Sequence, residues 1–131
     1  MTKKYIIANW KLKLSLSESE KLARAAVKKI PKKLVSREII LCPSFTALPA
    51  VQKIIKKSPL KLGAQNAFWE DRGAFTGEIS GLLLKELGVE YAILGHSERR
   101  QYLNETDEMI HLKIKSVINE GLTPILCVGE T

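Results

Sequence analysis

The stretch Tyr91-Ala-Ile-Leu-Gly-His-Ser-Glu-Arg-Arg100 passes from an apolar run, through a glycine and a histidine, into a polar segment. A short apolar run of this kind predicts a buried strand that ends at Gly95. Ser97 and Glu98 are typical of the first turn of a helix. The stretch therefore predicts a strand-to-helix junction at which His96 lies between the two elements.

The same alternation recurs along the whole chain. Further strand-like runs cover residues 5–9, 38–42, 60–65 and 123–128, and helical periodicity covers a segment ending near residue 30 and residues 48–55, 79–87 and 110–118. Ser15 and Ser17 each precede a glutamate by three residues, which gives two possible capping boxes before the first helix. Repeated strand–helix units predict a parallel sheet covered by helices. An open doubly wound sheet and a partial barrel both fit this order.

Length and composition indicate one globular domain over residues 1–131, since no linker or low-complexity stretch divides the chain. No apolar run approaches the roughly 20 residues that span a membrane, and the N-terminal apolar run is too short for a signal peptide, so we expect a cytoplasmic location. The net charge of +7 comes partly from lysine pairs at helix ends, without interleaved aromatic residues. This pattern favours a solvated surface over nucleic-acid binding.

Cysteine and histidine are too sparse and too scattered for a metal site. Cys42 and Cys127 lie far apart, and the two histidines are His96 and His111. Both cysteines end apolar runs, so we expect buried, reduced thiols. His111 lies within a helical segment and is assigned to packing or to the surface.

Polar residues follow the predicted strands at their carboxyl ends, where parallel α/β proteins bind ligands. A lysine, a histidine and side-chain amides at one rim suit an anionic substrate with oxygens to be polarised. Lys11 could equally be a surface lysine, and His96 a structural cap. The dipole of the helix after His96 would favour a neutral imidazole that can donate a hydrogen bond. The set comprises Asn9, Lys11, Gln65, Asn66, His96, Ser97, Glu98 and Glu130.

The loop Gly73-Ala-Phe-Thr-Gly-Glu78 is long and apolar for a plain turn. Phe75 at its tip indicates a contact surface. The partner would be another subunit, or the loop would fold back onto its own domain. The residues alone leave both possibilities open.

Five motifs resemble the triosephosphate isomerase family in order and spacing, and together they extend from one end of the chain to the other. They are Asn9-Trp-Lys11, Gly63-Ala-Gln-Asn66, Gly73-Ala-Phe-Thr-Gly-Glu-Ile-Ser80, Leu94-Gly-His-Ser-Glu-Arg-Arg100 and Cys127-Val-Gly-Glu-Thr131. The resemblance implies a TIM (β/α)8 barrel of which only the first five strands and four helical segments are present. It also implies interconversion of dihydroxyacetone phosphate and D-glyceraldehyde 3-phosphate through an enediolate, in glycolysis and gluconeogenesis.

The resemblance also implies a role for each matched residue. His96 would be the neutral electrophile that moves a proton between the substrate oxygens, Lys11 would stabilise substrate charge, and Asn9 would help to position the substrate. Glu98, Ser97 and Cys127 would support this site, Cys127 by packing. The loop that carries Phe75, Thr76 and Glu78 would enter a neighbouring subunit, so the complete protein would be a homodimer. No cofactor or metal is implied.

The chain departs from the family pattern in two respects. Leu12-Lys13-Leu14 stands where the family often has Met-Asn-Gly. The catalytic glutamate after strand six, its lid and the phosphate loops would lie beyond Thr131, and a whole barrel takes about 250 residues. Glu130 follows strand five, but its family counterpart is structural, so we do not assign it as the base.

Two interpretations remain. The first is a truncated triosephosphate isomerase. The second is a non-catalytic half-barrel that needs a separate complementing chain, because five strands leave open sheet edges. An unrelated flavodoxin-like domain would require all five motifs to be coincidental. We expect the isolated chain to be poorly stable, aggregation-prone and inactive.

Overall fold

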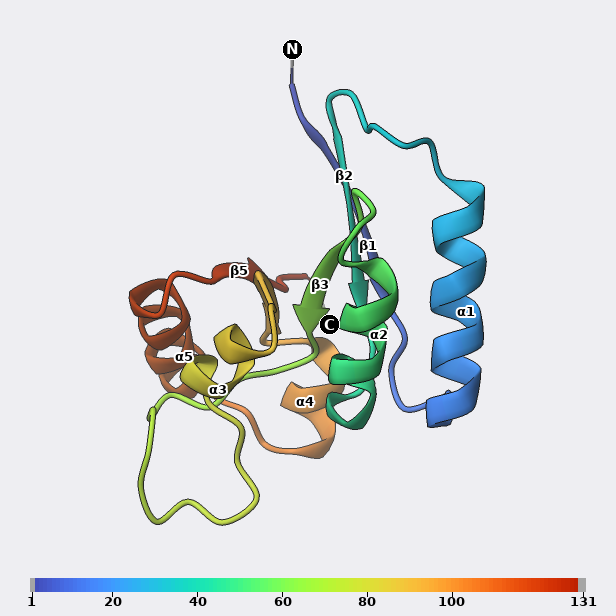
Figure 1. The fold of residues 1–131 in the computed structure, drawn as a ribbon. Coiled ribbons are helices and arrows are strands. Elements are labelled where there is room, and N and C mark those ends of the chain that lie inside the picture. Colours follow the sequence, from blue (N-terminus) through green and yellow to red (C-terminus); the bar gives the residue numbers. More distant parts are fainter. Residues whose placement is uncertain (1, 130–131) are drawn as a thin grey trace. The chain divides into compact units, whose positions relative to one another are not determined.

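The structure is a computed structural model that describes residues 2–129 (Figure 1). The sequence-based assignment of Glu130 therefore lies outside the described residues. The chain forms two compact units, of which the first ends at Gln65 and the second begins at Asn66.

The first unit contains three parallel strands, β1 (Lys4–Asn9), β2 (Arg37–Cys42) and β3 (Lys61–Ala64), with β2 in the middle. Asn9 pairs with Cys42, and Leu41 pairs with Leu62, so the carboxyl ends of the strands lie in register. Helix α1 (Leu16–Lys29) joins β1 to β2, and a 3-10 turn (Phe45–Ala47) leads into α2 (Leu48–Ile55) before β3. Parallel neighbours with helical crossovers are the arrangement that the alternating pattern predicts.

Side chains spaced three to four residues apart on α2 form much of the first unit's core. Leu48, Val51 and Ile55 lie on one face of the helix and are fully or almost fully buried. Helix α1 packs on α2 and adds a buried alanine to the core, and the strands add further buried side chains. These residues are Ala23, Ile40, Cys42 and Leu62. β1 differs from β2 and β3, since its Tyr5 and Ile6 remain 55% and 49% exposed.

Ser15, rather than Ser17, begins α1. The Ser15 hydroxyl accepts a hydrogen bond from the Glu18 N–H at 3.2 Å, and the Glu18 carboxylate accepts one from the Ser15 N–H at 3.0 Å. This reciprocal pair is a capping box, so the first of the two predicted boxes is confirmed. The hydrogen bonds of the Glu18 carboxylate with Ser15, first with its backbone N–H and then with its side chain, lower the pKa of Glu18.

The second unit contains two parallel strands, β4 (Tyr91–Leu94) and β5 (Thr123–Leu126), which pair from Tyr91–Thr123 to Leu94–Leu126. Helix α3 (Gly81–Glu86) precedes β4, and α4 (Ser97–Tyr102) and α5 (Asp107–Asn119) lie between the strands in the chain. α5 packs against both strands. Four helical segments thus separate the five strands, as predicted, and the last of them is divided into α4 and α5.

Candidate active site

A tight turn after β1 carries Lys11. The backbone φ of Lys11 is 54°, a left-handed conformation that non-glycine residues rarely adopt and that costs about 1 kcal/mol or more. The Lys11 N–H donates a hydrogen bond to Asn9 Oδ1 at 3.0 Å. From the other side, Gln65 Nε2 donates to the Lys11 carbonyl at 3.0 Å and to the Cys42 carbonyl at 2.9 Å. The side chains of Asn9 and Gln65 therefore hold the strained turn.

This geometry places Asn9 and Lys11 together at the end of β1, as predicted, and adds Gln65 from the end of β3. Sequence reasoning noted Gln65 only as a polar residue after a strand. Its position directly after a buried strand was the signal, but only the structure shows that its amide group binds the Lys11 backbone. Leu12, within the segment that departs from the family pattern, is 96% exposed.

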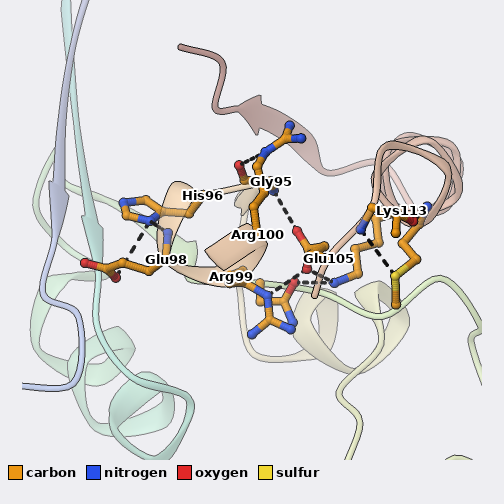
Figure 2. Close-up of polar contacts among 10 residues, drawn as sticks. Gly95, His96, Glu98, Arg99, Arg100, Glu105 and Lys113 are labelled. Atoms are coloured by element: carbon orange, nitrogen blue, oxygen red, sulfur yellow. Dashed lines mark hydrogen bonds and ion pairs between the residues drawn. The ribbon is translucent and has the colours of Figure 1, made fainter. Parts of the chain in front are cut away.

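His96 occupies the N-cap position of α4 in the second unit (Figure 2). Its Nδ1 accepts a hydrogen bond from the Glu98 N–H at 3.1 Å. The Glu98 carboxylate lies 3.7 Å from the same nitrogen, which is too long for a hydrogen bond, so the backbone N–H is the partner. A nitrogen that accepts a hydrogen bond from a backbone N–H carries no proton, so Nε2 is the ring nitrogen that remains available to donate.

Gly95, immediately before His96, is held on both sides. Its N–H donates to Glu105 Oε1 at 3.1 Å, and its carbonyl accepts from Arg100 Nε at 2.8 Å. The residue has a φ of 71°, which glycine adopts without strain. The backbone that leads into His96 is thus fixed by two charged side chains.

Glu105 is the centre of a buried ionic cluster that is shown in Figure 2. Its Oε2 accepts hydrogen bonds from Arg99 Nε at 2.8 Å and from Lys113 Nζ at 2.6 Å. Lys113 also donates to Asn66 Oδ1 at 2.9 Å. Among the described residues, no buried side-chain nitrogen or oxygen lacks a hydrogen-bond partner, and this cluster follows that rule.

The pKa values in this cluster follow from burial and charge. Burial alone would raise the pKa of Glu105, but the hydrogen bonds and charges of Lys113 and Arg99 outweigh it and hold the pKa below its usual range. Burial lowers the pKa of Lys113, and Glu105 opposes that shift. The cluster was missed by sequence reasoning. A lysine between Ile110 and Val117 on the buried face of α5 is the signal that could have found it.

Cys127 follows β5. Its N–H donates to the Leu94 carbonyl at 2.9 Å, and its own carbonyl accepts from Arg100 Nη2 at 3.4 Å. Burial raises the pKa of the Cys127 thiol, and the charge of Arg100 opposes this shift. Burial also raises the pKa of Cys42, to about 12. Both thiols are unpaired. The prediction of buried thiols is confirmed for Cys42, whereas Cys127 is only half-buried and lies between the exposed residues Leu126 and Val128.

The loop before α3 folds partly onto its own unit. The Phe68 N–H donates to the Ile79 carbonyl at 2.8 Å, and the ring of Phe75 lies 4.9 Å from that of Phe68. Phe75 nevertheless remains 43% exposed. Thr76 and Glu78 are exposed beside it. The loop thus makes contacts within its own unit and still presents an aromatic side chain to solvent.

A pocket is formed by this loop and the start of α3, and His96 does not line it. Phe68, Arg72 and Phe75 line it together with the carboxylates of Glu70, Asp71 and Glu78. Three carboxylates against one guanidinium would repel a phosphate. The pocket therefore does not suit an anionic substrate.

Of the other predicted residues, Ser97 is the first residue of α4, and His111 is exposed on α5. Within residues 2–129, no group of three or more His, Cys, Asp or Glu side chains could hold a metal ion. Among the helices of those residues, none has the length and apolar character needed to cross a membrane.

Parallel strands joined by helical crossovers define an α/β protein, a class whose members bind ligands at the carboxyl ends of their strands. The sequence profile of the triosephosphate isomerase family matches residues 4–131. The chain belongs to the triosephosphate isomerase family, and this match confirms the predicted fold class, a partial TIM barrel.

Individual relatives agree with the family match. The triosephosphate isomerase of Trichodesmium erythraeum is 50% identical over 131 residues, which is 100% of this chain and 54% of that protein. Those of Dictyoglomus thermophilum and Clostridium tetani are 50% and 44% identical and are covered over 52% and 51% of their lengths. The chain spans about half the length of these relatives.

Proposed function

We propose that the complete protein interconverts dihydroxyacetone phosphate and D-glyceraldehyde 3-phosphate through an enediolate, as a step of glycolysis and gluconeogenesis. Membership of the family supports this reaction. The observation that carries it is the hydrogen bond that His96 Nδ1 accepts from the Glu98 N–H, which leaves Nε2 as the ring nitrogen that can hold and donate a proton. An imidazole in this state can donate a hydrogen bond to a substrate oxygen and exchange a proton with it.

Lys11 and Asn9 are assigned to substrate binding. The ammonium group of Lys11 would attract the phosphate and the developing enediolate charge, because a point charge stabilises an oxyanion most in a site that excludes water. The strained Lys11 backbone supports a functional role, since such strain persists where the surrounding structure enforces it. Asn9 would position the turn and the substrate. Ser97, Glu98 and Cys127 would support His96 and its surroundings.

The catalytic base and the phosphate loops are assigned to polypeptide outside this chain. The relatives are nearly twice as long as the chain. The family resemblance implies that the base follows strand six. The isolated 131-residue chain is accordingly expected to be inactive. The alternative is a non-catalytic half-barrel that is completed by a separate chain. In that case the remaining strands are encoded in another gene, whereas in a fragment of one longer enzyme they are encoded in the same reading frame.

The loop with Phe75, Thr76 and Glu78 is assigned to a homodimer contact in the complete protein. The exposed face of Phe75 supports this assignment. No cofactor or metal is required by the proposed reaction, because a base, an electrophile and a cation suffice for enolisation. The cytoplasm is the proposed compartment, as for a glycolytic enzyme.

The test is a coupled isomerase assay on the protein expressed from its complete reading frame, with His96→Asn as the variant and His111→Asn as the control. We expect His96→Asn to lower kcat by between about 10²- and 10⁴-fold, the usual contribution of a general acid–base group. His111→Asn replaces an exposed histidine of α5 and should leave kcat unchanged. Full turnover by His96→Asn would contradict the proposal.

The same assay on the 131-residue chain distinguishes the remaining cases. No turnover alone and turnover after addition of a separately encoded C-terminal chain would favour the half-barrel. Turnover by the chain alone that His96→Asn abolishes would contradict the assignment of the base to other polypeptide, and Glu130 would be the next residue to replace.

A further inference from the structure

The contacts of Gly95 show how the backbone of His96 is fixed. The Gly95 carbonyl belongs to the same peptide plane as the His96 N–H, and Arg100 Nε donates to that carbonyl at 2.8 Å. The peptide plane on the other side of Gly95 contains its N–H, which Glu105 holds at 3.1 Å. Arg100 therefore fixes the plane from which the His96 side chain departs.

Resting on the function proposed above, we propose that Arg100 is a positioning residue that orients the His96 imidazole through the Gly95–His96 peptide. Without this contact the glycine would have unusual freedom to rotate, because glycine populates many backbone conformations. The existing space is tight, since a Cβ built on Gly95 would lie 3.0 Å from both Arg100 Nη2 and Ile110 Cδ1. The junction therefore combines a flexible residue with a fixed guanidinium (Figure 2).

Arg100 is itself anchored at two further points. Its Nη1 donates to Asp107 Oδ1 at 2.7 Å, and its Nη2 donates to the Cys127 carbonyl at 3.4 Å. The planar guanidinium thus connects the end of β4, the end of β5 and the first residue of α5. Only arginine offers several donors in a rigid fork, so a lysine could keep at most part of this arrangement.

If Arg100 had only a structural role, its replacement would lower stability and leave kcat unchanged. Asp107 is largely exposed, and an ion pair in that setting adds little to stability. Arg100 is about one-third exposed, so its removal leaves no buried charge, in contrast to removal of Glu105. Catalysis is more sensitive than stability, since displacement of a catalytic group by about 1 Å can cost about 10²-fold in rate.

The experiment compares Arg100→Met and Arg100→Lys in the protein expressed from its complete reading frame. Arg24→Met is the matched control, because Arg24 also pairs with a carboxylate but lies on α1. We expect Arg100→Met to lower kcat between about tenfold and 10²-fold with KM changed less than about threefold, and Arg100→Lys to be intermediate. The ring ¹⁵N signals of His96 should shift or broaden in Arg100→Met and stay unchanged in Arg24→Met.

An Arg100→Met variant that folds and keeps the wild-type kcat and His96 ring signals would overturn the proposal, even if it unfolds at lower temperature. If Arg100→Met does not fold, Arg100→Lys decides, and a wild-type kcat in that variant overturns the proposal. The variant His96→Asn distinguishes failure of the proposed function from failure of the positioning role. Full turnover by His96→Asn would contradict the proposed function. A lower kcat in His96→Asn together with a wild-type kcat in the Arg100 variants would contradict only the positioning role.

Discussion

Lys113 and Glu105 form an ion pair in the interior of the second unit, with 2.6 Å between Nζ and Oε2 and side chains that are 3% and 2% exposed. Such a pair is not strongly stabilising against an apolar pair of the same shape, because both charges lose their hydration. Loss of one partner is costly, since the other charge then remains buried without compensation.

Replacement of Glu105 should therefore destabilise the protein more than replacement of Lys113. Glu105→Leu leaves Lys113 buried with only the Asn66 oxygen as a partner, and we expect a loss of about 3–5 kcal/mol in the free energy of unfolding. Lys113→Met leaves Glu105 bound to Arg99 and should cost less. The double variant should lose less than the sum of the single variants. Urea unfolding of the complete protein measures all three, and additive losses would contradict the coupling.

The same cluster predicts a loss of stability in acid. The pKa of Glu105 in the folded chain lies below its ordinary value of 4.5. Above pH 4.5 the carboxylate is charged in both states and the stabilisation is fully present. As the pH falls from 4.5 through the folded pKa, the unfolded chain takes up the proton first, so the free energy of unfolding decreases.

Lys113→Met should flatten this dependence, because one of the two cations that lower the Glu105 pKa is gone. The measurement is the free energy of unfolding in urea between pH 7 and pH 3 for both proteins. Arg24→Met is the control, since it removes a cation from an exposed pair in the first unit. Parallel curves for wild type and Lys113→Met would show that the cluster does not contribute to the acid response.

The start of α1 offers a test with a built-in control. Ser15→Ala removes the hydroxyl that accepts from the Glu18 N–H and should cost about 1 kcal/mol in the free energy of unfolding. Ser17→Ala changes the serine of the other possible capping box, which lies inside the helix, and should cost much less. Equal losses in thermal unfolding for the two variants would contradict the assignment of Ser15 as the cap.

Periodicity predicted the strands and helices well because the core positions repeat in a regular way. Leu48, Val51 and Ile55 on α2 show this directly. The short helix α4 has no buried residue and so no apolar face to reveal it beyond the serine and glutamate at its start.

The sequence predicted which residues form the candidate site but not the contacts that hold them. His96 and Lys11 were recognised from their positions after strands and from the family motifs. The contacts that hold them were not, because they join residues far apart in the sequence. Gln65 lies 54 positions from Lys11, and Lys113 lies 47 from Asn66. The side-chain alternation of a strand or helix contains no information on such pairings.

Gln65 should control the Lys11 turn and through it the binding of substrate. Gln65→Met is close in shape but removes both hydrogen bonds, to the Lys11 and Cys42 carbonyls. The strained Lys11 backbone would then relax toward a right-handed or extended conformation, and its ammonium group would move. We expect kcat/KM for the triose phosphate to fall about tenfold or more in the complete protein, chiefly through KM.

Gln52→Met on α2 is the matched control, because it makes the same substitution at a half-buried position outside the strand ends, and it should keep kcat/KM. Gln65→Glu provides a second test of the mechanism. A carboxylate has nearly the same shape but cannot donate to a carbonyl, so it should lower kcat/KM at least as far as the methionine. Wild-type kcat/KM in a folded Gln65→Glu protein would show that the amide donor does not hold Lys11, and the Asn9 oxygen would remain as the contact that fixes the turn.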